Sequence, residues 1–366
     1  MLIAMLSSGS CVHSVRWANA LAAEGLQVHL LSLHPFSPQL SADVTCHRLR
    51  FGPPQGYFLN VKELKKRLAT ISPDILHTHY ASGYGTLGRL SGFHPQILSV
   101  WGSDVYDFPT RGRWHRWLIN RNLRNADLVC STSYAMERHV RKLCSGLGEI
   151  PITPFGVDTD LFRAADDSND GNVITIGTVK TLAPKYGVDT LIRGFEICRR
   201  RLIAERHVSE TSLRLRIVGD GPERSRLEKL ADRLGIGSVT SIRGAVPHID
   251  VPSELRKLDI YVAASRLESF GVAILEASAC QLPVVVTNVG GLPEVVEEEV
   301  TGLLVPKDNP EELAAALCRL VVNPDLREEL GRAGAERVAS LYRWEESVAK
   351  MIDLYDRHFQ CGRMVA

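Results

Sequence analysis

The sequence predicts an α/β protein built from two doubly wound, Rossmann-like parallel-sheet domains. Its 366 residues exceed what one hydrophobic core comfortably holds. Short apolar runs rich in β-branched residues or leucine alternate with helical patterns, which indicates parallel βα units. This alternation stops in the proline-containing and then polar stretch 151–172 and afterwards starts again. We therefore expect one sheet on each side of an interdomain linker.

The first half carries the strand and helix signals of one such sheet. Apolar residues in its strands run on instead of alternating, as in central strands buried on both faces. The expected strands are 2–6, 28–33, 44–51, 74–77, 96–101 and 127–131, and the clearest helices are 14–25 and 61–71.

The second half repeats the pattern and ends in helices. The expected strands are 173–179, 213–218, 239–243, 260–263 and 284–287, and the expected helices include 188–201, 222–234, 310–322 and 325–339. A last amphipathic helix follows Trp344, with Val348, Met351, Tyr355 and Phe359 on its apolar face. We expect domains at 1–160 and 161–342, with 343–366 packing back toward the first domain.

Composition excludes several classes of protein. The chain is 45% hydrophobic and 23% charged with a formal net charge of +1, which is not the signature of a nucleic-acid binder. Its eight cysteines form no C-x-x-C pair, which argues against a zinc site or a disulfide framework and for a reducing cytoplasm. No apolar run approaches the ~20 residues of a membrane helix. We expect a soluble, cytoplasmic protein.

The most informative stretch is 265–299. Glu268 precedes a Ser-Phe-Gly turn and the helical run 272–280, inside which Glu276 is flanked by apolar residues. A second helix is expected to start at Leu292, after two glycines. Helix N-termini offer unpaired N–H groups and a positive dipole end, which suit a phosphate. We expect this stretch to hold the diphosphate and sugar of an activated donor.

Two lysines flank the loop after the first strand of the second domain. Lys180 and Lys185 stand in GTVKTLAPKYG, so strand ends would bring them near the Glu268 stretch. As point charges they would clamp a diphosphate. The alternative is a solvated loop.

Polar residues in the first domain are harder to interpret. The turn SSGSC has no G-x-G-x-x-G and no acid closes the next strand, which argues against a domain that binds NAD. Gly9 is either a tight turn or a close approach to a ligand. His13, His77 and His79 are either general bases or loop residues without a role, and their spacing fits no metal site.

A basic, tryptophan-containing segment runs from Arg111 to Arg124. RGRWHRWLINRNLR has five arginines interleaved with apolar residues. Such a helix either contacts an anionic membrane surface, here at the inner face, or packs its apolar side into the core.

Several motifs resemble glycosyltransferase family 4. The segments that show this resemblance are ESFGVAILE from Glu268 to Glu276, the following TNVGGLPEVVEEEVTGLLVPKDNPEELAAAL, VGDGPERSRLEKLA, FGVDTDLF and RWANALAAEGLQVHLLS. They span nearly the whole chain. The resemblance implies the GT-B fold, in which two facing Rossmann-like domains enclose a cleft, with the acceptor bound by the first and the donor by the second.

The resemblance also implies roles for individual residues. Glu268 would contact hydroxyls of the transferred sugar, and the backbone amides of Phe270, Gly271 and Val272 would hold sugar and diphosphate. Glu276 would accept hydrogen bonds from the ribose.

Lys180 and Lys185 resemble the Arg/Lys pair that neutralises the leaving diphosphate, and Lys185 is the closer match to it. If Gly9 approaches a ligand, we expect that ligand to be the donor.

The chain departs from the family at Trp101, where many members carry a histidine that contacts the sugar. Tryptophan would stack on a sugar or reshape the cleft. Trp101 begins the turn W-G-S-D, which recurs in members that resemble surface-polysaccharide enzymes. The acceptor-side candidates are therefore His13, His77, Trp101 and Asp104.

The implied activity is a retaining hexosyl- or N-acetylhexosaminyl-transferase that needs no metal and no cofactor. The donor would be a nucleotide sugar, with uridine diphosphate the expected carrier, and the acceptor a glycan or a lipid-linked sugar. Two alternatives remain: a UDP-sugar epimerase of the same architecture, and a non-catalytic subunit that binds a sugar nucleotide.

Overall fold

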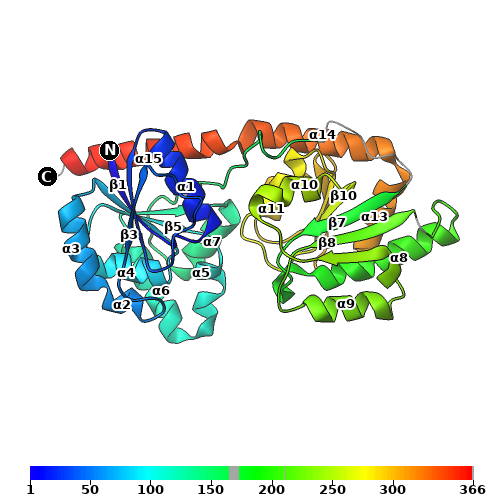
Figure 1. Cartoon of the computed structure of the whole chain (residues 1–366), viewed down its shortest axis with the longest axis horizontal. Coiled ribbons are helices and arrows are strands. Elements are labelled where there is room, and N and C mark those ends of the chain that lie inside the picture. The colour runs from blue at the N-terminus through cyan, green and yellow to red at the C-terminus, as the bar shows by residue number, and fades with distance from the viewer. Residues whose placement is uncertain (165–172, 211, 365–366) are drawn as a thin grey trace. The chain divides into compact units, whose positions relative to one another are not determined.

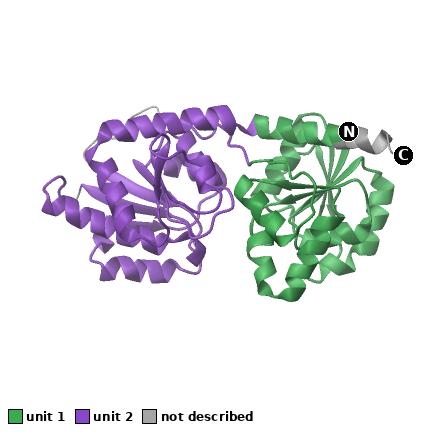
Figure 2. Cartoon of the chain, turned by 180° about the vertical axis from the view of Figure 1, so that it is seen from behind, with its two compact units in different colours: residues 1–154, 346–366 green, residues 155–345 purple. Residues whose placement is uncertain are grey.

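The computed structural model describes residues 1–164, 173–210 and 212–364, with side chains as far as Arg357. It divides into two compact units (Figure 2). Unit 1 comprises Met1–Pro154 with Glu346–Ala366, and unit 2 comprises Phe155–Glu345. The boundary therefore precedes the expected one at 160/161. Residues 165–172 of the expected linker lie outside the described residues.

Unit 1 is a parallel sheet with helices on both faces (Figure 1). Its strands are β1 Leu2–Leu6, β2 Gln27–Ser32, β3 Val44–Arg48, β4 Ile75–His79, β5 Gln96–Val100 and β6 Leu128–Ser131. Its helices are α1 Val12–Ala23, α2 Gly56–Leu59, α3 Val61–Ile71, α4 Gly83–Ser91, α5 Ser103–Tyr106, the 3-10 turn η1 Phe108–Arg111, α6 Arg113–Asn125 and α7 Tyr134–Leu143, followed by α15 Trp344–Met364 from Glu346 on.

Alternation along β4 shows how both faces of this sheet are covered. Leu76 packs with Leu64, Leu68 and Leu87 of α3 and α4 in one apolar cluster. His77 points to the opposite face, because successive side chains in a strand alternate. There its ring meets Tyr355 of α15. The C-terminal helix thus closes the second face of the first sheet. The side chain of Phe359, expected on the apolar face of this helix, lies outside the described residues.

Unit 2 is a second parallel sheet of the same type. Its strands are β7 Ile174–Val179, β8 Leu213–Val218, β9 Thr240–Arg243, β10 Ile260–Ala263, β11 Val284–Thr287 and β12 Gly302–Val305. Its helices are α8 Val188–Ala204, α9 Arg224–Arg233, α10 Val251–Leu255, α11 Val272–Ala279, α12 Leu292–Val295, α13 Pro310–Val322 and α14 Pro324–Leu341, with 3-10 turns η2 Pro184–Tyr186, η3 Gly237–Val239 and η4 His248–Asp250.

The prediction of two doubly wound α/β sheets is confirmed. Some local predictions were wrong. β4 continues to His79, two residues beyond the expected end at His77, so the alternative that these histidines are loop residues is wrong. The helix expected to start at Leu292 does start there, and it is the single turn α12. β12 was not predicted, since GLLV is a short strand at the edge of the sheet.

Strand order places the functional loops. The first sheet runs β3-β2-β1-β4-β5-β6 and the second runs β12-β11-β10-β7-β8-β9. In each sheet the chain starts in the middle, winds to one edge and then returns to build the other half. The order therefore reverses between β1 and β4 and between β7 and β10. In open parallel sheets, ligands bind at such a reversal, outside the carboxyl ends of the strands.

Candidate active site

An ion pair lies at the strand-order reversal of unit 2. Lys180 follows β7, Glu268 belongs to the loop after β10, and these two strands are hydrogen-bonded neighbours. Nζ of Lys180 lies 2.7 Å from Oε2 of Glu268, and the side chains are only 14% and 12% exposed. The structure thus brings together two of the predicted site residues from positions far apart in the sequence.

The surroundings of Lys180 keep it charged. Burial alone would lower the pKa of this lysine, but the charge and hydrogen bond of Glu268, together with Tyr261 and Tyr186, outweigh burial and raise the pKa. The ring of Tyr186 also faces the ammonium group, with its centroid 4.7 Å from Nζ. Burial raises the pKa of the neighbouring Tyr261 despite the opposing charge of Lys180. The site therefore holds a fixed cation in a poorly hydrated position.

A glycine turn braces the loop that carries Glu268. The amide of Gly291 donates to the carbonyl oxygen of Glu268 at 3.2 Å. Gly290 has a φ of +53°, and a Cβ there would come within 1.8 Å of that same oxygen. Any larger residue at 290 would push the loop away, so the glycine permits the close approach that fixes Glu268.

The N-terminus of α11 follows directly. Gly271 precedes the helix with a φ of +117° and offers no side chain to cap it. The first amides of a helix have no partner within the helix and carry the positive end of its dipole. Phe270 itself is buried, and its ring packs against Tyr342. Its side chain is thus part of the core, and only its backbone amide is a candidate for donor binding.

Lys185 lies in the same loop after β7 as Lys180, and its backbone joins this loop to the loop after β10. Its carbonyl oxygen accepts from the amides of Arg266 at 2.7 Å and Leu267 at 3.3 Å, which joins the loop after β7 to the loop after β10. Its Nζ lies 5.2 Å from the centroid of Tyr186, whose ring also faces Lys180. Both predicted lysines therefore flank Tyr186, and Lys180 makes the direct contact with Glu268.

Glu276 has a partner that sequence reasoning missed. Its Oε1 lies 2.8 Å from Nε2 of His248, in the turn η4 after β9. A carboxylate buried in an apolar helix needs such a hydrogen bond. The available signal was a histidine in a Pro-His turn after a strand, at the carboxyl edge where ligands bind. Without the strand order, nothing in the sequence pairs this histidine with Glu276.

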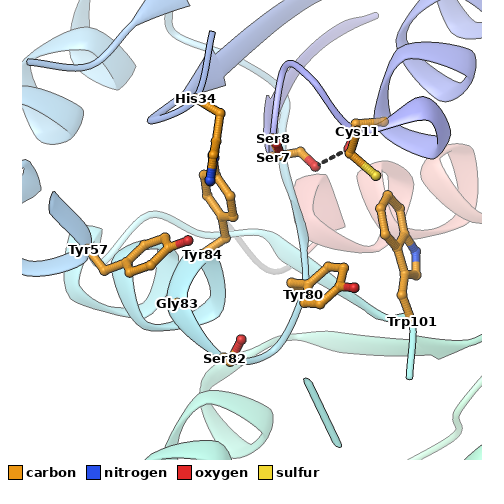
Figure 3. Close-up of a pocket in the computed structure, with 11 residues that line it drawn as sticks. Ser7, Ser8, Cys11, His34, Tyr57, Tyr80, Ser82, Gly83, Tyr84 and Trp101 are labelled. Carbon is orange, nitrogen blue, oxygen red and sulfur yellow. Dashed lines mark hydrogen bonds between the residues drawn. The ribbon is translucent and has the colours of Figure 1, made fainter. Parts of the chain in front are cut away.

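Unit 1 has a cavity of about 220 Å³ at its own strand-order reversal (Figure 3). Residues that follow β1, β2, β4 and β5 contribute to it. Its lining is Ser7, Ser8, Cys11, Ser14, His34, Tyr57, Tyr80, Ser82, Gly83, Tyr84 and Trp101. None of these described lining residues is Lys, Arg, Asp or Glu. Burial and the nearby charge of Arg48 lower the pKa of His34, so this imidazole is held neutral. The cavity is uncharged, and both aromatic rings and serine hydroxyls line it.

The acceptor-side candidates differ in whether they line this cavity. Trp101 lines it, and its ring centroid lies 4.4 Å from that of His79 and 6.0 Å from that of His13, which stands edge-on. Asp104 is buried and accepts hydrogen bonds from the amides of Ala81, Trp101 and Gly102, so it shapes the turn that presents Trp101.

His77 does not line the cavity. Its Nδ1 lies 2.6 Å from the hydroxyl of Tyr355 and its Nε2 lies 2.8 Å from Oγ of Ser99. Burial lowers the pKa of His77 to about 3. Gly9 is not among the lining residues either, and a Cβ there would meet the ring of Phe36 at 2.5 Å. Packing accounts for both residues in this structure, and their functional roles stay predictions.

The described residues lack two features, a cluster of metal ligands and a membrane-spanning helix. Nowhere in them do three His, Cys, Asp or Glu side chains gather as metal ligands would. None of their helices combines the length and apolar character needed to cross a membrane.

Comparisons with known proteins identify relatives of both units. The family Glycosyl transferases group 1 matches residues 162–337, and the family Glycosyl transferase 4-like matches residues 2–133. The GDP-mannose-dependent alpha-(1-6)-phosphatidylinositol monomannoside mannosyltransferase of Mycobacterium tuberculosis is 32% identical over 285 residues, which are 72% of this chain and 70% of that protein.

Two further comparisons extend over most of the chain. An uncharacterised glycosyltransferase of Methanocaldococcus jannaschii is 27% identical over 306 residues, which are 82% of this chain and 80% of that protein. The solved structure of sucrose-phosphate synthase from Thermosynechococcus elongatus superposes with a TM-score of 0.86 at 24% identity and covers 99% of this chain and 100% of that one. This last likeness concerns the fold alone.

Proposed function

The chain is a glycosyltransferase of family 4 with the GT-B fold, and we propose that it transfers a sugar, with retention of anomeric configuration, from a nucleoside diphosphate donor to a glycan or lipid-linked acceptor. The observation that carries this proposal is the Lys180–Glu268 pair at the strand-order reversal of unit 2. A cation for the diphosphate and an acceptor of hydrogen bonds for the sugar stand side by side there.

The donor would be held by three kinds of group. Lys180, with Lys185 beyond the ring of Tyr186, would face the diphosphate together with the free amides at the start of α11. Glu268 would accept hydrogen bonds from hydroxyls of the sugar. Glu276, eight residues further along the chain, would accept them from the ribose.

The reaction requires stabilisation of the leaving diphosphate. The bond between the anomeric carbon and the β-phosphate oxygen breaks, and its electron pair stays on that oxygen. The acceptor hydroxyl attacks the anomeric carbon from the same face and gives its proton to the departing diphosphate. Lys180 and the dipole of α11 would offset the charge that develops, which is the role a metal ion has in other transferases. We therefore propose that no metal is needed.

Two nucleotides are candidates for the carrier of the donor sugar. The sequence favours a UDP-linked sugar, whereas the mycobacterial relative is named for its dependence on GDP-mannose. Hexosyl and N-acetylhexosaminyl groups both remain candidates for the transferred sugar. A role in surface-polysaccharide or glycoconjugate biosynthesis would fit the W-G-S-D turn at Trp101.

The cavity of unit 1 supports an uncharged sugar as the part of the acceptor that binds there. Aromatic rings pack on the apolar face of a sugar, and serine and tyrosine hydroxyls bond its hydroxyl groups. A phosphate or carboxylate would find no cation among the lining residues. We therefore expect a neutral terminal sugar at this position, even in an acceptor whose lipid part is charged.

A two-step experiment tests the proposal. UDP-, GDP- and ADP-sugars are first screened for thermal stabilisation of the protein, since a ligand at 100 times its Kd contributes about 2.7 kcal/mol. The hits are then incubated with and without an acceptor. A transferase releases nucleoside diphosphate and attaches the sugar to the acceptor. An epimerase alters the sugar without an acceptor, and a non-catalytic subunit binds the donor and leaves it intact, so either outcome would refute the proposal.

A further inference from the structure

Helix α6 belongs to unit 1 (Figure 1). It exposes two neighbouring tryptophans. The side chain of Trp114 is 61% exposed and that of Trp117 is 44% exposed. Their rings stack with centroids 4.6 Å apart and an interplanar angle of 23°. Large aromatic residues are usually buried in most of their area, so an adjacent exposed pair indicates a surface that contacts something else.

The core does not require these tryptophans. Leu118, Ile119 and Leu123 form the buried face of α6, and Ile119 and Leu123 belong to the apolar cluster beneath it. The sequence left open whether the apolar residues of this helix pack inward or face an external surface. The structure divides them, because the aliphatic residues pack inward and the tryptophans point outward.

Unpaired positive charge surrounds the tryptophan pair. Arg113, Arg116 and Arg121 are exposed on the same helix. Within the described residues, none of their guanidinium groups forms a salt bridge with an acid. Other exposed helical arginines do form one, as Arg200 does with Glu196 and Arg357 with Asp353. The charge on α6 is therefore available to an external anion.

We propose that this face of α6, made of Arg113, Trp114, Arg116, Trp117 and Arg121, docks on an anionic lipid surface. Tryptophan prefers the boundary between headgroups and acyl chains, where its ring is in apolar surroundings and its N–H reaches water. Arginines beside it are attracted to anionic headgroups at the same depth. The docking does not depend on the proposed sugar transfer.

The same residues fit a nucleic acid less well. Stacking of bases needs open aromatic faces. Trp114 covers one face of Trp117, and the guanidinium of Arg121, one turn further along the helix, lies 5.3 Å from the centroid of the Trp117 ring. The edges of the rings remain open, and edges are what a tryptophan inserts between lipid headgroups.

Vesicle co-sedimentation of the full chain tests the proposal. The probes are vesicles of phosphatidylcholine alone and vesicles that also contain phosphatidylglycerol, at low salt. The wild-type protein should sediment with the anionic vesicles at least tenfold better than with the neutral ones, and salt at about 1 M should release it. The tryptophan fluorescence should shift to the blue on binding.

Two variants and two matched controls make the test specific to α6. Trp114→Ala/Trp117→Ala and Arg113→Gln/Arg116→Gln/Arg121→Gln should each weaken sedimentation at least tenfold without changing the melting temperature. Val322→Ala/Leu341→Ala removes exposed apolar residues of unit 2, and Arg200→Gln/Arg233→Gln/Arg332→Gln removes exposed charge there; both should sediment as the wild type does. Wild-type protein that stays in the supernatant, α6 variants that still sediment, or binding of single-stranded RNA in preference to the vesicles would overturn the proposal.

Discussion

Nζ of Lys180 lies 2.7 Å from Oε2 of Glu268 at the point where the strand order of the second sheet reverses. The charge of Glu268 helps to raise the pKa of Lys180, which stays ionised in a poorly hydrated position. The site is therefore charged and oriented before a donor arrives, and little reorganisation is needed during the reaction. The pair contributes both to the stability of the fold and to the chemistry of the site, and each contribution can be measured by itself.

The first prediction concerns the stability of the ion pair. Lys180→Met leaves Glu268 as a buried charge without its partner, and we expect it to lower the free energy of unfolding by about 3 kcal/mol. Adding Glu268→Gln removes the orphaned charge and should recover most of that loss. Urea denaturation of the single and double variants measures the coupling. Additive effects of the two substitutions would show that the pair does not interact in solution.

The second prediction concerns the nucleotide. Glu276→Gln should raise the Kd for the nucleoside diphosphate by about 10- to 100-fold, since hydrogen bonds to a charged group are worth ~1.5–3 kcal/mol. His248→Gln should have a smaller effect, because this histidine positions Glu276. Isothermal titration with the ribonucleotide and with its 2′,3′-dideoxy analogue separates the roles. The difference between wild type and Glu276→Gln should vanish with the dideoxy analogue, and a difference that persists would exclude a contact between Glu276 and the ribose.

The third prediction concerns the acceptor cavity. Tyr57→Ala and Trp101→Ala should each raise the KM for the acceptor by up to about tenfold, because one aromatic contact is worth ~0.5–1.5 kcal/mol. Hydrolysis of the donor alone should stay at the wild-type rate. Phe58→Ala is the control, since this residue is next to Tyr57 but 51% exposed and outside the cavity lining. Equal losses in donor hydrolysis and in transfer would show that these residues do not act through binding of the acceptor.

The fourth prediction concerns acid stability. Burial lowers the pKa of His77 to about 3, whereas a histidine in an unfolded chain titrates near ~6.5. Between these pH values the unfolded state binds a proton that the folded state does not, so stability falls as the pH falls. This histidine alone should contribute about 1.4 kcal/mol per pH unit in that range.

Replacement of His77 measures this contribution. His77→Asn should flatten the decline of the free energy of unfolding between pH 6 and pH 4 by about 1.4 kcal/mol per unit. His207→Asn should leave the slope unchanged, because that side chain is 54% exposed. Identical slopes in all three proteins would mean that His77 is protonated in the folded state and that its bond to Tyr355 differs from the one described.

Sequence reasoning recovered those elements whose signals are local. The strands at 213–218, 260–263 and 284–287 have the predicted bounds because each has a local strand pattern. The first alternates leucine with arginine before Ile217 and Val218, and the other two are short runs of mainly β-branched and aromatic residues. The helix at 310–322 starts at its proline, behind Asn309, whose side chain caps it. Boundaries failed where the signal is tertiary, as in β4, whose polar end His77–His79 is buried by helix α15 and by Ser7 and Ser99.

The candidate site was recovered only in part for the same reason. Parallel strands end at one edge, so Lys180 and Glu268 could be expected near each other from their positions after strands. Which lysine makes the contact depends on the path of the loop around Tyr186, which no local pattern specifies. His248 and Tyr355 contact partners that are far away in the sequence. Only the folded structure within each unit shows those contacts.

The fifth prediction tests the central claim, that the Lys180–Glu268 pair binds and activates the donor. The decisive measurement is kcat for sugar transfer by the Lys180→Met/Glu268→Gln double variant, in which no unpaired charge is left to unfold the site. We expect kcat to fall by at least ~10²–10³-fold, the loss typical of one electrostatic donor at a developing anion, while the melting temperature stays near that of the wild type. Lys229→Met, a change of an exposed lysine on α9, should retain wild-type kcat. A stable double variant with near wild-type kcat would contradict the assignment of this pair as the catalytic site.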